Sequence, residues 1–209
     1  MIKDMFACQH SPLNFSTEKH NVFFTSDVHF NHGNIIKYCR RPFDTVEEMN
    51  EALIRNWNSV VGPEDVVFCL GDFMFGNINR FWDFRSRLNG KIYLVHGNHD
   101  WNLMDNGDID GAFEMISAMM RINVDGQLIY LSHFPFLTYD GIYKEKKPYW
   151  QLFGHVHSNK NNLYSSPDID RLKYLLPMQY DVGVDNNDYK PVSFDEVKAI
   201  IEAQQSDKS

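Results

Sequence analysis

The sequence predicts an α/β fold (α+β in some classification schemes), in which two mixed β-sheets pack together with helices outside them. Short apolar runs alternate with helix-like segments along much of the chain, a pattern that favours parallel strands. Farther along, Asp125-Gly126 separates two strand-like runs and indicates an antiparallel hairpin. Two packed sheets accommodate both kinds of pairing. Because the 209 residues contain no internal repeat or Pro/Ser/Gly-rich linker, we expect a single domain over residues 1–209.

Five apolar runs have the length and composition of buried strands. Each run has four or five residues and is rich in β-branched and aromatic side chains. The runs are residues 22–25, 66–70, 91–95, 127–131 and 149–153. These segments are the expected framework of the two sheets.

Helices are predicted between and after these runs. Residues 45–57 repeat apolar side chains at helical spacing, and Asp44 or Thr45 can cap the first turn. A second apolar face over residues 78–88 ends at Asn89-Gly90, a common helix stop. Residues 193–203 predict a closing amphipathic helix. Residues 158–178 show little periodicity, so we expect a long surface loop near the functional site.

Composition and charge narrow the class of protein. A net charge of −8 disfavours broad binding to nucleic acid, because such binding depends on Lys and Arg neutralising phosphates. The sequence has no apolar run of bilayer length and no signal-peptide pattern. Three scattered cysteines, Cys8, Cys39 and Cys69, show neither disulfide nor metal-ligand spacing and are expected to be inert thiols. We therefore expect a cytoplasmic protein that does not bind membranes.

Metal-ligand side chains follow all five strand-like runs. Gly or Ser precedes the first ligand after each run and permits a tight turn there. In open α/β sheets, ligand sites lie beyond the carboxyl ends of the strands, so these distant residues should meet at one edge. The candidate ligands are Asp27, His29, Asp72, Asn98, His133, His155 and His157.

The chemistry of these side chains indicates the metal. Imidazole combined with carboxylate and amide oxygen suits first-row transition metals better than Mg²⁺ or Ca²⁺. Seven ligands exceed what one ion needs if water and substrate must also bind, so two ions sharing Asp72 are the simplest interpretation. We expect two divalent transition-metal ions, with manganese first and iron, nickel, cobalt or zinc as alternatives.

The motifs resemble those of the calcineurin-like metallophosphoesterases. That family's pattern of D-x-H, G-D, G-N-H-[DE], a single His and G-H-x-H matches five blocks between residues 27 and 157. The resemblance implies a four-layer α/β/β/α sandwich. It also implies one metal on Asp27, His29, Asp72 and His157, and another on Asp72, Asn98, His133 and His155. His99, off the metals and paired with Asp100, would face the scissile phosphate.

Two further segments resemble a small bacterial and phage-type branch of this family. They are residues 29–36 leading into Arg41-Pro42-Phe43, and residues 181–185. The segment after Asp72 lacks the second Asp and the Arg of the family's protein phosphatases. Phosphatase action on proteins is therefore not expected.

The predicted reaction is hydrolysis of a phosphate ester. A hydroxide bridging two metal ions would attack phosphorus in line, since metal-bound water ionises near neutral pH. His99 would protonate the leaving oxygen, and Asp100 would hold the His99 ring. A guanidinium forks onto phosphate oxygens, so Arg41, together with Arg40, is expected to bind substrate, with His32 and Asn34 on the same wall.

Several substrates fit this pattern. Phosphodiesters, phosphomonoesters and nucleotides are all candidates, and an open site mildly favours diesters or nucleotides. A nuclease would need basic and aromatic residues beside the cleft, and residues 144–150 offer only a modest cluster. A catalytically silent scaffold would be expected to lack a ligand or His99, whereas all are present.

Overall fold

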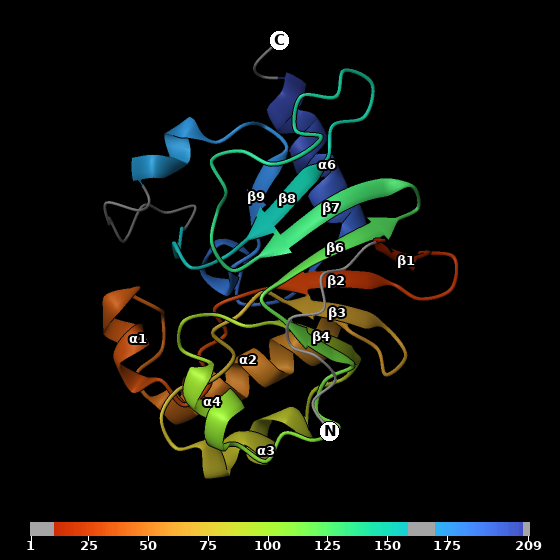
Figure 1. The fold of residues 1–209 in the computed structure, drawn as a ribbon. Coiled ribbons are helices and arrows are strands. Elements are labelled where there is room, and N and C mark those ends of the chain that lie inside the picture. The colour runs from red at the N-terminus through yellow and green to blue at the C-terminus, as the bar shows by residue number, and fades with distance from the viewer. Residues whose placement is uncertain (1–10, 159–169, 207–209) are drawn as a thin grey trace.

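Two five-stranded β-sheets form the centre of the molecule in the computed structural model, which describes residues 11–158 and 170–206 (Figure 1). The first sheet has the order β1-β6-β7-β8-β9 and the second β10-β2-β3-β4-β5. The strands of the first sheet are β1 (Leu13–Phe15), β6 (Met119–Val124), β7 (Gln127–Ser132), β8 (Trp150–Phe153) and β9 (Gln179–Asp181). Those of the second are β2 (Val22–Thr25), β3 (Val66–Cys69), β4 (Lys91–Val95), β5 (Met115–Ser117) and β10 (Val192–Ser193).

Both sheets are mixed, as the sequence predicts. In the second sheet β2, β3, β4 and β5 are parallel neighbours, and only β10 is antiparallel to β2. In the first sheet β7, β8 and β9 are parallel, whereas β6 and β7 form the predicted hairpin. Asp125 and Gly126 both have positive φ, 47° and 82°, which matches the twist of a two-residue hairpin. The carboxyl ends of β2, β3, β4 and β5 therefore lie at one edge of the second sheet, and those of β7, β8 and β9 lie at one edge of the first.

The two long predicted helices are confirmed. Helix α2 (Val46–Val60) begins at Thr45, whose side chain accepts the amide N–H of Glu48. Helix α6 (Phe194–Ser206) begins with a capping box, in which Ser193 and Glu196 exchange side-chain and backbone hydrogen bonds.

The continuous helix predicted over residues 78–88 is instead a short 3₁₀ turn (Ile78–Arg80) followed by α3 (Phe81–Arg85). After α3, the Arg85 guanidinium donates to the carbonyl groups of Ala112, Leu88 and Gly90 and so holds the segment that follows the helix. Short elements that the sequence did not reveal are α1 (Gly33–Tyr38), α4 (Trp101–Asn106) and 3₁₀ turns at Leu172–Tyr174 and Val184–Asn186.

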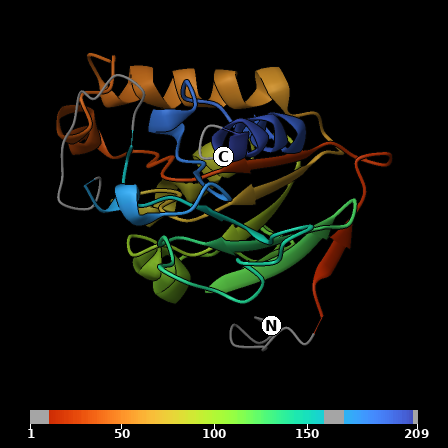
Figure 2. The same cartoon turned by 90° about the horizontal axis from the view of Figure 1, so that it is seen from above.

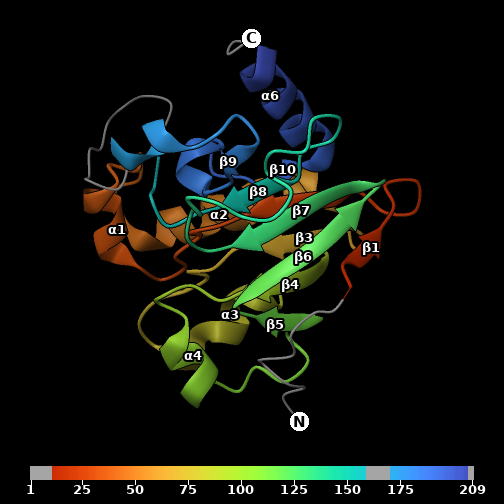
Figure 3. The same ribbon diagram turned by 45° about the horizontal axis from the view of Figure 1, so that its top comes forward.

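Two apolar cores hold the layers together. One core lies between the sheets and joins residues such as Phe24, Phe68 and Leu131. The other lies between the second sheet and the helices, where Trp57 of α2 is buried and donates its indole N–H to Asn89. Figure 2 shows the orange α2 and the green β6 on opposite sides of β2 and β3. Helix α6 contacts β9, β10 and β2, so it covers one edge of both sheets (Figure 3).

Some predictions fall partly outside the described residues. Residues 159–169 of the expected loop and Cys8 are not described, while Cys39 and Cys69 are buried free thiols. Within residues 11–158 and 170–206, every helix is too short or too polar to cross a bilayer. The single-domain organisation stays a prediction.

Candidate metal centre

The predicted ligands meet at the carboxyl ends of five strands. Asp27 and His29 follow β2, Asp72 follows β3, Asn98 follows β4, His133 follows β7, and His155 and His157 follow β8. Among the described residues, ligand atoms within 4.8 Å of one another form three groups. Two consist of predicted ligands only, and we name them the Asp27 group (Asp27, His29 and His157) and the Asp72 group (Asp72, His133 and His155). The third joins His157 to Cys39 and Asp185, which were not predicted as ligands.

Asp72 lies between the two groups. Its Oδ2 atom is 3.6 Å from His29 Nε2 and 3.5 Å from His133 Nε2. Its Oδ1 atom accepts the backbone N–H of His99 at 2.9 Å, which fixes the carboxylate. Asn98 Oδ1 lies 3.0 Å from His133 Nε2 and so adds an amide oxygen to the Asp72 group. The geometry therefore allows one carboxylate to serve both groups.

The backbone at these positions is strained. Asp27, His29, Asp72, His155 and His157 all have φ between 48° and 69°, a region that residues with side chains rarely adopt. Such conformations persist where the surrounding structure enforces them, commonly at functional sites. Here, Asp27 donates its amide N–H to Gly71 and His29 donates to Asp72. A Cβ at Gly97 would collide with the Asp72 carboxylate, so glycine is needed there.

Buried polar atoms in the Asp27 group need a partner. Asp27 Oδ1 and His29 Nε2 are inaccessible and lack a hydrogen bond within the described residues. Leaving such groups unpaired is costly, and a cation between them would satisfy both. Burial, aided by the charge of Asp27, raises the pKa of Asp72, while burial and nearby His157 lower the pKa of His29. A neutral His29 imidazole beside crowded carboxylates fits a divalent cation.

A buried ion pair supports the Asp27 group. The Asp185 carboxylate accepts from His157 Nδ1 at 2.8 Å and binds the Arg41 guanidinium at 2.9 and 2.8 Å. Burial by itself would raise the pKa of Asp185, but Arg41 and His157 outweigh it and hold that pKa at about 2. A carboxylate on the second nitrogen of a metal-binding histidine fixes the ring orientation.

Arg41 therefore does not have the substrate-binding position that the sequence predicted. Its side chain is buried, and its remaining N–H groups donate to the carbonyl oxygens of Asp27 and Val28. These contacts consume the guanidinium and hold the loop that carries Asp27 and His29. Arg40 is exposed. Asp185 was not predicted as a site residue, although the late Asp-Val-Gly-Val-Asp segment was the signal that could have identified it.

Asp100 also has partners other than the predicted one. Its fully buried carboxylate accepts the backbone N–H groups of Asp72, Phe73 and Gly97 at 2.8, 2.9 and 2.8 Å. Burial raises the pKa of Asp100 to about 7 despite these hydrogen bonds. We therefore revise its role from orienting the His99 ring to joining the loops after β3 and β4.

Like His157, two more of the histidines have their second nitrogen in contact with a neighbour. His133 Nδ1 lies 2.8 Å from the carbonyl oxygen of Leu70, so it donates there and leaves Nε2 toward Asp72. His29 Nδ1 lies 3.2 Å from His32 Nδ1. Burial and the neighbouring His99 lower the pKa of His32 to about 4, which keeps the His32 ring neutral at physiological pH. His32 thus supports a ligand as well as lining the site.

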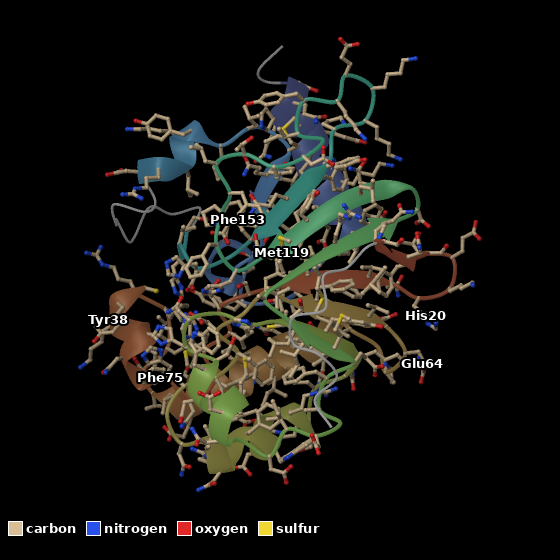
Figure 4. All side chains as sticks on the ribbon, viewed as in Figure 1. His20, Tyr38, Glu64, Phe75, Met119 and Phe153 are labelled. Atoms are coloured by element: carbon tan, nitrogen blue, oxygen red, sulfur yellow. The ribbon has the colours of Figure 1, made fainter. Side chains whose placement is uncertain are left out.

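A cleft of ≈ 420 Å³ opens over the two groups, and His99, His32, Asn34, Tyr38 and Phe75 are among its lining residues. The exposed His99 ring lies 5.5 Å from His29 and 5.2 Å from Phe75, measured between ring centroids. Tyr38 and Phe75 lie on the same side of the molecule (Figure 4). Of the three predicted substrate-binding residues, His32 and Asn34 therefore lie in the wall of the cleft, and Arg41 lies behind it.

Comparison with known proteins agrees with this arrangement. The model of the family described as calcineurin-like phosphoesterase matches residues 20–192. The uncharacterized protein MJ1445 of Methanocaldococcus jannaschii is 35% identical over 185 residues, which cover 87% of this chain and 91% of that protein. The gene 66 protein of Mycobacterium phage L5 is 31% identical over 163 residues, which cover 66% of this chain and 78% of that protein.

A solved structure shares the fold. The protein of unknown function AQ665 from Aquifex aeolicus superposes with a TM-score of 0.63 at 27% identity, over 87% of this chain and 99% of that one. The matched family region, residues 20–192, includes every residue of the Asp27 and Asp72 groups. The chain therefore belongs to the calcineurin-like phosphoesterase family.

Proposed function

We propose that this protein hydrolyses phosphate esters with two divalent metal ions. The observation that carries the proposal is the position of Asp72, whose Oδ2 atom lies about equally far from a histidine of each group, at 3.6 and 3.5 Å. The unpaired buried atoms Asp27 Oδ1 and His29 Nε2 support a cation in the Asp27 group. Asp27, His29, Asp72 and His157 are the proposed ligands of one ion, and Asp72, Asn98, His133 and His155 those of the other.

The chain's own groups divide the remaining work. Bound divalent ions supply charge neutralisation for phosphate oxygens and acidify water toward neutral pH. His99 is exposed in the cleft beside the Asp27 group, where its ring can give a proton to the leaving oxygen. Asn34 and His32 lie in the same wall and can contact the substrate. Asp185, Arg41 and Asp100 position the ligand loops from behind.

Manganese is the metal that we propose first. The donor set combines imidazole nitrogens, carboxylates and one amide oxygen, with no thiolate among the proposed ligands. Iron, nickel, cobalt and zinc are accepted by similar donors. Elemental analysis of protein purified without added metal will identify the ion and its stoichiometry.

The central experiment compares three substrate types. Hydrolysis of nitrophenyl phosphate, its bis-nitrophenyl diester and cyclic nucleotides is measured with manganese, without added metal and with a chelator. We expect turnover that is abolished by the chelator and restored by manganese. Rates that the chelator leaves unchanged would overturn the two-metal proposal.

The position of the basic and aromatic cluster over residues 144–150 does not favour a nuclease. Lys147 lies by Gly126, at the hairpin end of β7, whereas His133 follows the opposite end of that strand. Trp150 is buried, and Lys144 stacks over the ring of Tyr149. The cluster over residues 144–150 is therefore remote from the cleft. The cytoplasmic location stays a prediction.

A further inference from the structure

An apolar groove adjoins the metal cleft. It has a volume of ≈ 440 Å³, and its walls include Phe134, Leu137, Leu172, Tyr174 and Leu175. His155 and Val156 line both this groove and the cleft over the metal groups. We name it the Phe134 groove. Because it shares a wall with the cleft, a molecule bound in the cleft can extend past His155 into the groove.

Its apolar side chains are unusually exposed. Phe134, Leu137 and Tyr174 are 48%, 78% and 65% exposed. A single exposed apolar residue needs no explanation, but a cluster around one depression is typical of a binding site. The groove therefore offers a favourable environment for an apolar group.

The Phe134 ring is held in a fixed position. It packs against the rings of His155 and His133, with centroids 4.5 and 4.8 Å away. Its carbonyl oxygen accepts from Ser132 Oγ at 2.8 Å and from Gln151 Nε2 at 3.0 Å. The buried Gln151 also accepts from the amide N–H of Phe136, so buried side chains fix the loop. A prearranged ring lowers the entropy lost on binding.

The positions of His99 and the groove distinguish the two arms of a substrate. His99 lies on the side of the cleft formed by His29, His32 and Phe75, where it would protonate a leaving group. The groove lies beside His155, in the other group. A phosphomonoester has no second arm to extend in this direction.

We infer that the Phe134 groove binds an aromatic, non-leaving ester arm of a phosphodiester substrate. This inference rests on the proposed function and specifies its substrate class. An aromatic arm is favoured because Phe134 and Tyr174 present rings that can stack or pack edge-on with it. The groove thereby selects among diesters without contacting the leaving group.

The test uses two diesters with the same leaving group, phenyl p-nitrophenyl phosphate and methyl p-nitrophenyl phosphate. Each kcat/KM of the manganese-loaded protein is divided by that ester's rate with hydroxide alone, which removes the difference in intrinsic reactivity. We expect the phenyl ester to be preferred by roughly tenfold or more, the usual worth of filling an apolar pocket.

A variant and a matched control locate this preference. Leu137→Ser combined with Tyr174→Ser removes exposed apolar surface and should reduce the phenyl-to-methyl ratio by about tenfold. Tyr143→Ser removes a ring that is 77% exposed and lies outside the groove lining, so it should leave the ratio unchanged. Equal ratios in all three proteins would overturn the inference.

Binding measurements separate this inference from the proposed function. Calorimetry with phenylphosphonate and methylphosphonate on the manganese-loaded protein should show the same preference, again reduced only in the double variant. Selective binding without hydrolysis would support the role of the groove in binding an aromatic arm and would contradict the proposed hydrolase function. Hydrolysis of both diesters without selectivity would sink the groove alone. Light scattering tests whether a second copy of the chain occupies the groove instead. A dimer that dissociates in the double variant but not in Tyr143→Ser would overturn the inference.

Discussion

The two groups of the candidate metal centre differ in the contacts that hold them and in the exposure of one candidate ligand, Asn98. In the Asp27 group, Asp27 and His29 are 0% and 1% exposed, and a charged pair behind them links His157 to Arg41. In the Asp72 group, Asn98 is exposed and His155 is partly exposed. The fixed nitrogen of His133 donates to a backbone carbonyl rather than a carboxylate. Both groups line the cleft, but the Asp27 group is backed by an ion pair, whereas the Asp72 group borders the Phe134 groove through His155.

This difference predicts different metal affinities. A carboxylate behind a histidine ligand raises its basicity and fixes its ring, and loss of such a contact commonly lowers metal affinity 10- to 100-fold. The Asp27 group has that contact through Asp185, at 2.8 Å from His157. We therefore expect the Asp27 group to retain its ion more firmly and the Asp72 group to exchange its ion first.

The largest expected effect follows from breaking the link between the groups. Asp72→Asn keeps an oxygen for the His99 amide N–H but removes the shared negative charge. Each ion contributes several kcal/mol, so we expect turnover to fall roughly 10⁴-fold or more. Metal content by elemental analysis should also fall. Full metal content with unchanged turnover would show that Asp72 does not connect the two groups.

The next largest loss of turnover is expected from replacing His99, which lies on the side of the cleft near the Asp27 group. His99→Ala should slow turnover about 10²- to 10⁴-fold, the usual worth of a positioned acid, while metal content stays normal. The loss should be greatest for substrates with poor leaving groups, which need a proton most. Rates for a series of substituted phenyl diesters will measure this dependence. Loss of metal from this variant would instead make His99 a ligand.

The convergence of most candidate ligands could be predicted from the sequence because their signals are local. A buried run followed by Gly or Ser and a metal-binding side chain identifies both a strand and its end. The roles of Arg41 and Asp100 could not be predicted in this way. Arg41 pairs with Asp185, which is 144 positions away in the sequence. Asp100 accepts the backbone N–H groups of Asp72 and Phe73, which are 28 and 27 positions away. Strands of two or three residues, such as β10 and β1, are too short to show periodicity.

A smaller effect on turnover, but a larger one on stability, is expected from the ion pair behind the Asp27 group. Asp185→Asn leaves the Arg41 charge buried without its anion, which should lower the free energy of unfolding by about 3–5 kcal/mol. Metal affinity of the Asp27 group should fall about 10- to 100-fold. Urea unfolding and manganese titration measure the two effects.

Glu51→Gln is the matched control for that variant. Glu51 also binds an arginine through both oxygens, at 2.7 and 2.6 Å from Arg87, but the pair is exposed. Loss of an exposed pair should change stability by only about 0–1 kcal/mol. Similar losses from both variants would mean that burial does not distinguish the pair behind the metal centre.

The smallest effect on metal binding is expected from replacing Asn98 in the Asp72 group. Asn98 is exposed, and its amide oxygen contacts His133 without a charge of its own, so Asn98→Ala removes a neutral ligand from the Asp72 group alone. Manganese titration should show one site weakened by about tenfold or more, since losing a direct ligand should cost at least as much as losing a contact behind one, and the other site unchanged. Asn102→Ala, on the exposed face of α4, is the control for a lost surface amide. If Asn98→Ala weakened both sites equally, the two groups would act as one unit, and their different supporting contacts would have no consequence for metal retention.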